Sequence, residues 1–132
     1  MIEPGGADRA ALLVGFARGL EDALAGLLGP QGFTIHRVGT VADAVTLLAA
    51  TPAHLVVASG RCPAASVVRL VAALGEPRTA RVLVLLAGRD VEAERRYREA
   101  GMKYIMTMPV TVAELLRVGG MAEDPPRARP VQ

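Results

Sequence analysis

Apolar runs alternate with amphipathic stretches along the chain, and this pattern predicts five strands in strict alternation with five helices. Four of the expected strands are short, nearly continuous apolar runs, which are typical of parallel strands buried on both faces. In chain order the expected strands are 10–16, 33–38, 54–58, 82–87 and 104–107. The second is the exception, because apolar and polar residues alternate along it, as in a half-exposed edge strand.

Between the strands, apolar residues recur at intervals of three and four positions, which is the spacing of a helix with one buried face. Residues suited to capping precede three of these stretches: Thr40, Asp90 and Thr111. In the fourth helix, Ala93, Tyr97 and Ala100 form a thin apolar stripe. The last helix is expected to be short, because Gly119 and Gly120 break it.

The order of these elements predicts the class of fold. Strands that alternate with helical crossovers form a parallel sheet with helices on both faces, and right-handed crossovers favour a doubly wound sheet. Because the alternating strand 33–38 belongs at an edge, the flavodoxin-like strand order 2-1-3-4-5 fits best. We therefore predict one α/β, doubly wound, five-stranded domain over residues 10–119. A flexible N-terminus (1–9) precedes it, and a disordered tail or linker (120–132) follows.

Composition narrows the class of protein further. The 132 residues are 52% hydrophobic but only 3% aromatic, so a single core must be built from Ala, Val and Leu. Charged residues interrupt every apolar stretch before it reaches the roughly 20 residues of a membrane-spanning helix. The N-terminus has no secretory signal, and the single Cys62 cannot form an internal disulfide, so we expect a cytoplasmic protein.

The charge pattern bears on partners. The formal net charge is +2, a mild basic excess. The densest group of arginines is interspersed with glutamates on one helix, which favours a solvated helix face over a nucleic-acid surface. We therefore expect neither a nucleic acid nor a membrane as partner.

Several local stretches resemble the receiver domains of bacterial two-component response regulators, the CheY-like family. A buried strand leads into Ser59, and Pro63 follows four residues later, at the spacing of the family's acceptor aspartate and its proline. Met108-Pro109 stands where the family has Lys-Pro after the last strand. The resemblance extends over residues 10–118. It implies a CheY-like fold and a cis peptide bond before Pro109.

The departures from the family fall on the residues that carry its chemistry. Receivers have an acidic pair after the first strand, the acceptor aspartate, a Thr or Ser after the fourth strand, and the Lys. In this chain the corresponding positions hold Gly15, Phe16, Ser59, Leu86 and Met108. Acyl-phosphate formation needs a carboxylate nucleophile, and Mg²⁺ is usually held by carboxylates. We therefore expect a degenerate phosphorylation pocket without Mg²⁺-dependent phosphorylation, metal, cofactor or enzymatic activity.

The leading functional hypothesis is an atypical receiver-like (pseudo-receiver) domain in signal transduction. Such a domain would act by phosphorylation-independent binding of a protein partner or by forming a homodimer. In the resembling family, the fourth helix, last strand and last helix make these contacts. The corresponding face here is expected to include Tyr97, Lys103, Ile105, Glu114 and Arg117.

The alternative hypothesis is a domain that senses a small ligand, either an anion or a nucleotide. Ligands of open α/β sheets bind outside the carboxyl ends of the strands, at the point where the strand order reverses. Arg18 and Arg61 are expected near helix N-termini at this crevice, where they could hold an anion. A competing expectation is that Phe16 plugs the crevice.

Overall fold

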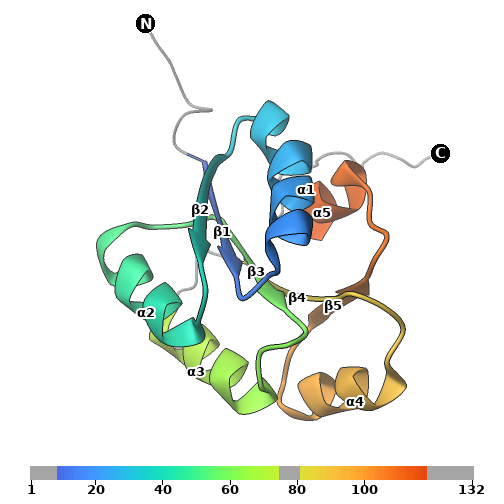
Figure 1. Ribbon diagram of the computed structural model, residues 1–132. Helices are drawn as coiled ribbons and strands as arrows, with labels where there is room; N and C mark the ends of the chain where they lie inside the picture. The colour runs from blue at the N-terminus through green and yellow to red at the C-terminus, as the bar shows by residue number, and fades with distance from the viewer. Residues whose placement is uncertain (1–8, 75–80, 119–132) are drawn as a thin grey trace, which may run out of the picture.

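The computed structural model describes residues 9–74 and 81–118, and these residues form one five-stranded parallel sheet in the order β2-β1-β3-β4-β5 (Figure 1). The strands are β1 (Ala10–Val14), β2 (Thr34–Val38), β3 (Leu55–Ser59), β4 (Arg81–Leu86) and β5 (Tyr104–Thr107). The helices are α1 (Arg18–Leu28), α2 (Val41–Ala50), α3 (Ala64–Leu74), α4 (Val91–Glu99) and α5 (Val112–Val118), with a 3₁₀ turn, η2 (Gly29–Gln31), after α1. The predicted flavodoxin-like fold class is confirmed.

The expectations for the two ends of the chain lie almost entirely outside the described residues. Only Arg9 of the expected N-terminal segment is described, and its carbonyl accepts the Thr34 N–H at 2.8 Å. The expected tail, and the glycines at positions 119 and 120, lie beyond the described part. Within that part, no helix combines the length and apolar character needed to cross a membrane.

Helices α1 and α5 cover one face of the sheet, and α2, α3 and α4 cover the other (Figure 1). Alternate residues of each central strand supply the two cores. In β1, Leu12 faces the core under α2–α4 and Leu13 faces the core under α1 and α5. Every residue of β1 and β3 is buried, which explains why these strands read as continuous apolar runs.

The two edge strands are more exposed than the central ones. In β2, which is the alternating segment of the sequence, two residues are exposed and three are partly buried. All four residues of β5 at the opposite edge are partly buried. The predicted edge position of the second strand is therefore confirmed, and its polar residues Thr34 and Arg37 are exposed.

The predicted helix caps are confirmed. Thr40 and Asp90 each accept the backbone N–H three residues further on, at 3.1 and 3.0 Å. Before α5, Thr111 Oγ1 accepts the Glu114 N–H at 3.1 Å, and Glu114 Oε1 accepts the Thr111 N–H at 2.7 Å, which makes a reciprocal capping box. The bond from the Thr111 N–H is the main reason why the pKa of Glu114 is lowered, because it stabilises the carboxylate.

Candidate functional site

The carboxyl ends of β1 and β3 meet at the middle of the sheet, which places Gly15 beside Ser59. A Cβ atom at position 15 would lie 3.7 Å from Cβ of Ser59 and 2.9 Å from Sγ of Cys62. Gly15 also has a φ of +78°, a left-handed conformation that favours glycine. The sulfur of Cys62 therefore occupies the space that a side chain at position 15 would need.

Ser59 is buried and bonded within its own loop. Its side chain and backbone are only 4% exposed. The hydroxyl Oγ accepts the Arg61 N–H at 3.1 Å, and the carbonyl oxygen accepts the Cys62 N–H at 3.0 Å. This hydroxyl thus closes a tight turn after β3, and it lacks the exposure that a nucleophilic serine requires.

The thiol of Cys62 forms the floor of the same crevice. It is buried and donates to the Val14 carbonyl, with 3.8 Å between sulfur and oxygen. Burial raises the pKa of this thiol, although the Ser59 hydrogen bond and the charge of Arg61 oppose the shift. The group therefore stays protonated at neutral pH, when a reactive cysteine would be a thiolate.

Leu86 at the end of β4 packs directly onto the residue after Ser59. A Cβ atom on Gly60 would lie 2.5 Å from Cδ2 and 3.4 Å from Cα of Leu86. Only a glycine at position 60 leaves room for this leucine. The Met108 N–H donates to the Leu86 carbonyl at 2.8 Å, so the end of β5 lies beside the end of β4. The Met108–Pro109 peptide bond is cis, as expected.

The five positions of the expected degenerate pocket therefore all lie at the carboxyl ends of the strands, but their side chains divide between the two faces of the sheet. Leu86 belongs to the core under α2–α4. Phe16 and Met108 pack against the core under α1 and α5. Gly15 and Ser59 lie at the boundary between the two, where the first and third strands end.

The expectation that Tyr97 belongs to an exposed partner-binding face is wrong. Tyr97 is 3% exposed and packs in the core under α2–α4, as the apolar stripe of its helix indicated. Its hydroxyl donates to the loop after β3, where the carbonyl oxygens of Gly60, at 2.9 Å, and Cys62 are both within reach. Burial raises the pKa of this phenol, and the nearby Cys62 raises it further. Tyr97 thus ties α4 to the crevice.

The other four residues of the expected partner-binding face reach the surface. Lys103 and Arg117 are exposed, while Ile105 and Glu114 are partly buried. Ile105 also packs against the core that contains Tyr97. These four residues come from β5, its preceding loop and α5.

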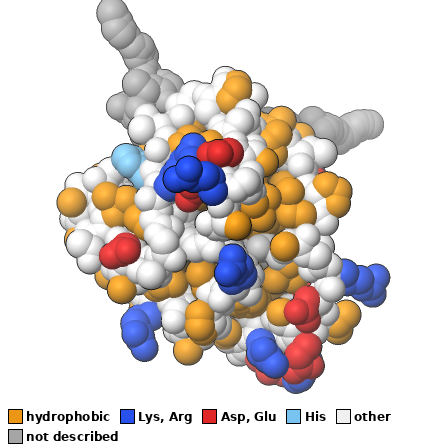
Figure 2. Space-filling model, in the orientation of Figure 1, with side chains coloured by type: hydrophobic (Ala, Val, Ile, Leu, Met, Phe, Trp, Pro, Cys, Tyr) orange, Lys and Arg blue, Asp and Glu red, His pale blue; other side chains and the backbone are white. Residues whose placement is uncertain are grey.

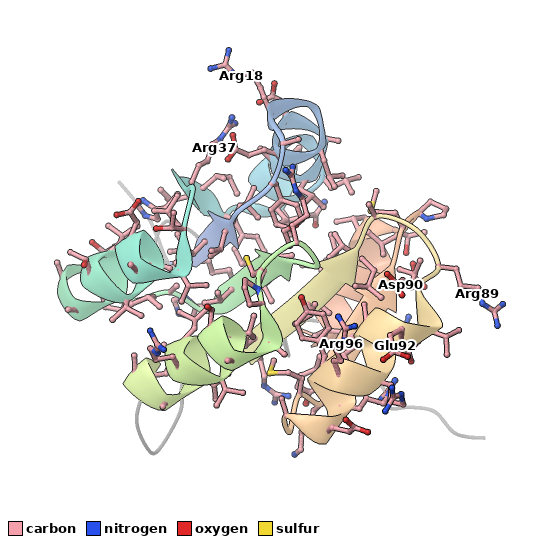
Figure 3. The ribbon with its side chains drawn as sticks, turned by 60° about the horizontal axis from the view of Figure 1, so that its bottom comes forward. Arg18, Arg37, Arg89, Asp90, Glu92 and Arg96 are labelled. Atoms are coloured by element: carbon pink, nitrogen blue, oxygen red, sulfur yellow. The ribbon has the colours of Figure 1, made fainter. Side chains whose placement is uncertain are left out.

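The charged side chains of α4 form a solvated surface, as their pattern indicated. They gather at the lower right of Figure 2, and Figure 3 labels two of them, Glu92 and Arg96. Arg95 pairs with Glu92 and Glu99, and Arg98 pairs with Glu94. Such exposed pairs contribute little to stability, at most about 1 kcal/mol each.

An open groove of about 1030 Å³ leads from the crevice along the surface between α2 and α3. Its lining residues are Gly15, Phe16, Gly39, Thr40, Val41, Ala42, Val45, Arg61, Cys62, Pro63, Ser66, Arg69, Ala72 and Ala73. Of the two arginines expected to hold an anion, Arg61 lines the groove. Arg18 does not, and Figure 3 shows its side chain pointing away from the molecule. Phe16 forms part of a wall and leaves the groove open.

The donor set at this edge does not fit the Mg²⁺ ion that the resembling family binds. No carboxylate lines the groove, and Ser59 offers a single hydroxyl that already accepts a hydrogen bond. In residues 9–74 and 81–118, no three His, Cys, Asp or Glu side chains are grouped so that they could hold a metal ion. Mg²⁺ prefers several oxygen ligands, including at least one carboxylate.

No family model and no curated protein matches this sequence. Solved structures match the fold closely. A putative response regulator from Chloroflexus aurantiacus superposes with a TM-score of 0.71 at 20% identity, over 86% of this chain and 96% of that one. A CheY-like receiver domain from Methylobacillus flagellatus gives a TM-score of 0.68 at 20% identity, over 83% and 94%. The chain has the fold of a response-regulator receiver domain.

The receiver fold is shared with regulators that carry out the phosphorylation chemistry. A response regulator from Burkholderia pseudomallei, whose structure contains a phosphorylated aspartic acid and a calcium ion, matches with a TM-score of 0.70 at 17% identity. This match covers 83% of the present chain and 65% of that regulator. Identities this low establish the receiver fold alone, so function must be argued from the residues themselves.

Three residues of the site were not expected from the sequence: Gly60, Cys62 as a packing residue, and Arg69. Gly60 carries no signal by itself, because its role depends on the side chain of the neighbouring strand. Arg69 does carry one, because it is the only charged residue in the otherwise apolar helix α3.

Proposed function

We propose that this chain is a pseudo-receiver, a receiver-like domain in signal transduction that acts without phosphorylation by binding a protein partner or a second copy of itself. One observation supports the proposal above others. The crevice where a receiver holds its acceptor carboxylate is packed here with Cys62 against Gly15 and Leu86 against Gly60. Both glycines accommodate side chains that a working phosphorylation site would exclude.

The chemistry of the crevice argues in the same direction. Phosphoryl transfer to a receiver requires a carboxylate nucleophile and a divalent cation. The end of β3 offers only the buried Ser59 hydroxyl, which already closes its own turn. Leu86 replaces a hydroxyl with a branched alkyl group, and Met108 replaces an ammonium group with a thioether. Each loss removes a different part of the machinery, so no single substitution restores it.

The surface around β5 is the candidate interaction face. β5 is an edge strand, so one row of its backbone N–H and C=O groups is available for pairing with another chain. Lys103 and Arg117 stand exposed beside it. Tyr97 ties α4, the helix that precedes β5, to the loop after β3, so we expect α4 to keep its place beside this face without a phosphoryl signal.

The proposal predicts association that is insensitive to phosphodonors. Light scattering after size exclusion is expected to show a dimer, or a complex with a partner recovered by affinity capture. The mass should be the same with and without acetyl phosphate and Mg²⁺. Reversing a charge at an interface rim destroys its complementarity to the partner, which slows encounter and weakens binding, so Lys103→Glu and Arg117→Glu should each weaken association several-fold. Arg18→Glu, which makes the same charge change at the exposed start of α1, outside the expected face, is the matched control.

Two results would count against this function. One is a chain that stays monomeric at every concentration and captures no partner. The other is association that appears only when acetyl phosphate and Mg²⁺ are present, because the domain would then respond to phosphorylation as an ordinary receiver does.

A further inference from the structure

The groove between α2 and α3 carries positive charge that no acidic side chain of the described residues pairs with. Arg61 lines it from the loop after β3, and Arg69 lines it from α3. Arg69 is five residues after Ala64, the first residue of α3, which is about 7 Å along the helix axis. Within the described residues, neither guanidinium forms an ion pair, whereas Arg37, Arg95 and Arg98 all do. The only acid of α2 and α3 is Asp43, which is not among the lining residues.

Neutral hydrogen-bond donors converge on the same groove. Val41 and Ala42 form the start of α2, and neither backbone N–H has an acceptor among the described residues. The positive end of the α2 dipole adds to this group. The hydroxyl group of Ser66 lines the opposite wall, on the first turn of α3. The donors come from two helices and one loop, so the site does not depend on a single helix terminus.

The remainder of the groove is apolar. Phe16 and Val45 line it from one side, and Ala72 lines it from the other. Its volume of about 1030 Å³ is at the upper end of the range for pockets that bind small organic ligands. A bare inorganic anion would contact the arginines and leave these apolar walls in water.

We propose that this groove binds a small phosphorylated molecule that also carries an aromatic or apolar group, of the size of a nucleotide. Arg61, Arg69 and the free amides of α2 hold the phosphate groups, and the aromatic part lies beyond Arg69, against Val45 of α2 and Ala72 of α3. The proposal revises the sequence-based expectation, because Arg69 takes the place given to Arg18. It does not depend on the proposed partner-binding face, which lies around the edge strand β5.

The test is isothermal titration calorimetry of the full chain with ADP, GDP and flavin mononucleotide, with pyrophosphate and adenosine as partial ligands. At least one of the three nucleotides is expected to bind with a dissociation constant below about 1 mM. It should bind more tightly than pyrophosphate, which lacks the aromatic part, and than adenosine, which lacks the phosphates. An acidic peptide of eight glutamates, added as competitor, should not displace it.

Arg61→Gln and Arg69→Gln should each weaken the binding of that nucleotide about tenfold or more, because a charge-assisted contact is lost. Arg18→Gln removes the same charge outside the groove and should change the affinity less than twofold. All three side chains are exposed, so unchanged thermal midpoints will show that the variants are folded.

Three outcomes would overturn the proposal. The first is the absence of saturable binding by all three nucleotides. The second is an equal loss in Arg18→Gln and Arg69→Gln, which would reduce the effect to net charge. The third is displacement by the glutamate peptide, which would make the groove a docking site for an acidic protein segment.

Discussion

Replacing Tyr97 with alanine is expected to lower the free energy of unfolding by about 3–5 kcal/mol, the usual cost of truncating a buried aromatic residue. The ring is 3% exposed and packs between α4 and the sheet. The hydroxyl of Tyr97 links α4 to the loop after β3, where it is within hydrogen-bond reach of the Gly60 and Cys62 carbonyls. Urea unfolding followed by circular dichroism measures the change.

Tyr97→Phe separates the hydrogen bond from the packing. It keeps the ring but leaves two part-buried carbonyls without their donor, which should cost about 1–3 kcal/mol. The matched control is Tyr104→Phe on β5, whose exposed hydroxyl accepts from Arg81 at 2.6 Å and should contribute less than about 0.5 kcal/mol. If Tyr97→Phe is as harmless as Tyr104→Phe, the link between α4 and the crevice is not a stabilising one.

Replacing Gly60 with alanine is expected to destabilise the fold by about 1–3 kcal/mol, the typical cost of overpacking a buried site. The added methyl group would meet Cδ2 of Leu86 at 2.5 Å, so the leucine would have to leave its present rotamer. Leu86 is buried among the residues under α2–α4 and has little room to move. Denaturant titration of the single variant gives the size of the effect.

A double-mutant cycle tests whether Leu86 is the cause. Leu86→Ala removes the colliding group, so the combined variant should be less destabilised than the sum of the two single variants by at least about 1 kcal/mol. Leu85→Ala is the matched control, because this neighbour points to the core under α1 and α5. The costs of Gly60→Ala and Leu85→Ala should simply add. Equal coupling in both cycles would show that the crevice is not built around Leu86.

Much of the fold was predictable because strand burial leaves a local trace in sequence. The central strands are buried on both faces, so they consist of continuous apolar residues, as in Leu55–Ser59, which begins LVVA. The β2 strand is more polar because it lies at an edge of the sheet, where Thr34 and Arg37 are exposed. The caps Thr40, Asp90 and Thr111 act on amides three residues away, so short stretches of sequence were sufficient to identify them.

The site was less predictable because its contacts join segments that are far apart in sequence. The contact of Leu86 with Gly60 depends on the register of β3 against β4, which pairs Ser59 with Leu85. The place of Arg69 in the groove depends on how α2 packs beside α3. Neither relation has a local signature.

Tyr97 shows how two kinds of sequence argument can disagree. Helical periodicity placed it on the inner stripe of α4, while the resemblance to receivers placed it on an exposed face. The structure agrees with periodicity, since the residue is buried. The spacing of apolar residues depends on how this particular chain packs, whereas a family resemblance indicates only which surface other members of the family use.

At the end of β3, packed side chains stand where a receiver would hold its acceptor carboxylate, and we propose that the domain therefore works without phosphorylation. The most direct measurement is the intact mass of the full chain after incubation with acetyl phosphate and Mg²⁺, with an active receiver as positive control. Because the end of β3 carries a buried serine and the groove contains no carboxylate, we predict an unchanged mass. A chain heavier by one phosphoryl group would contradict the account.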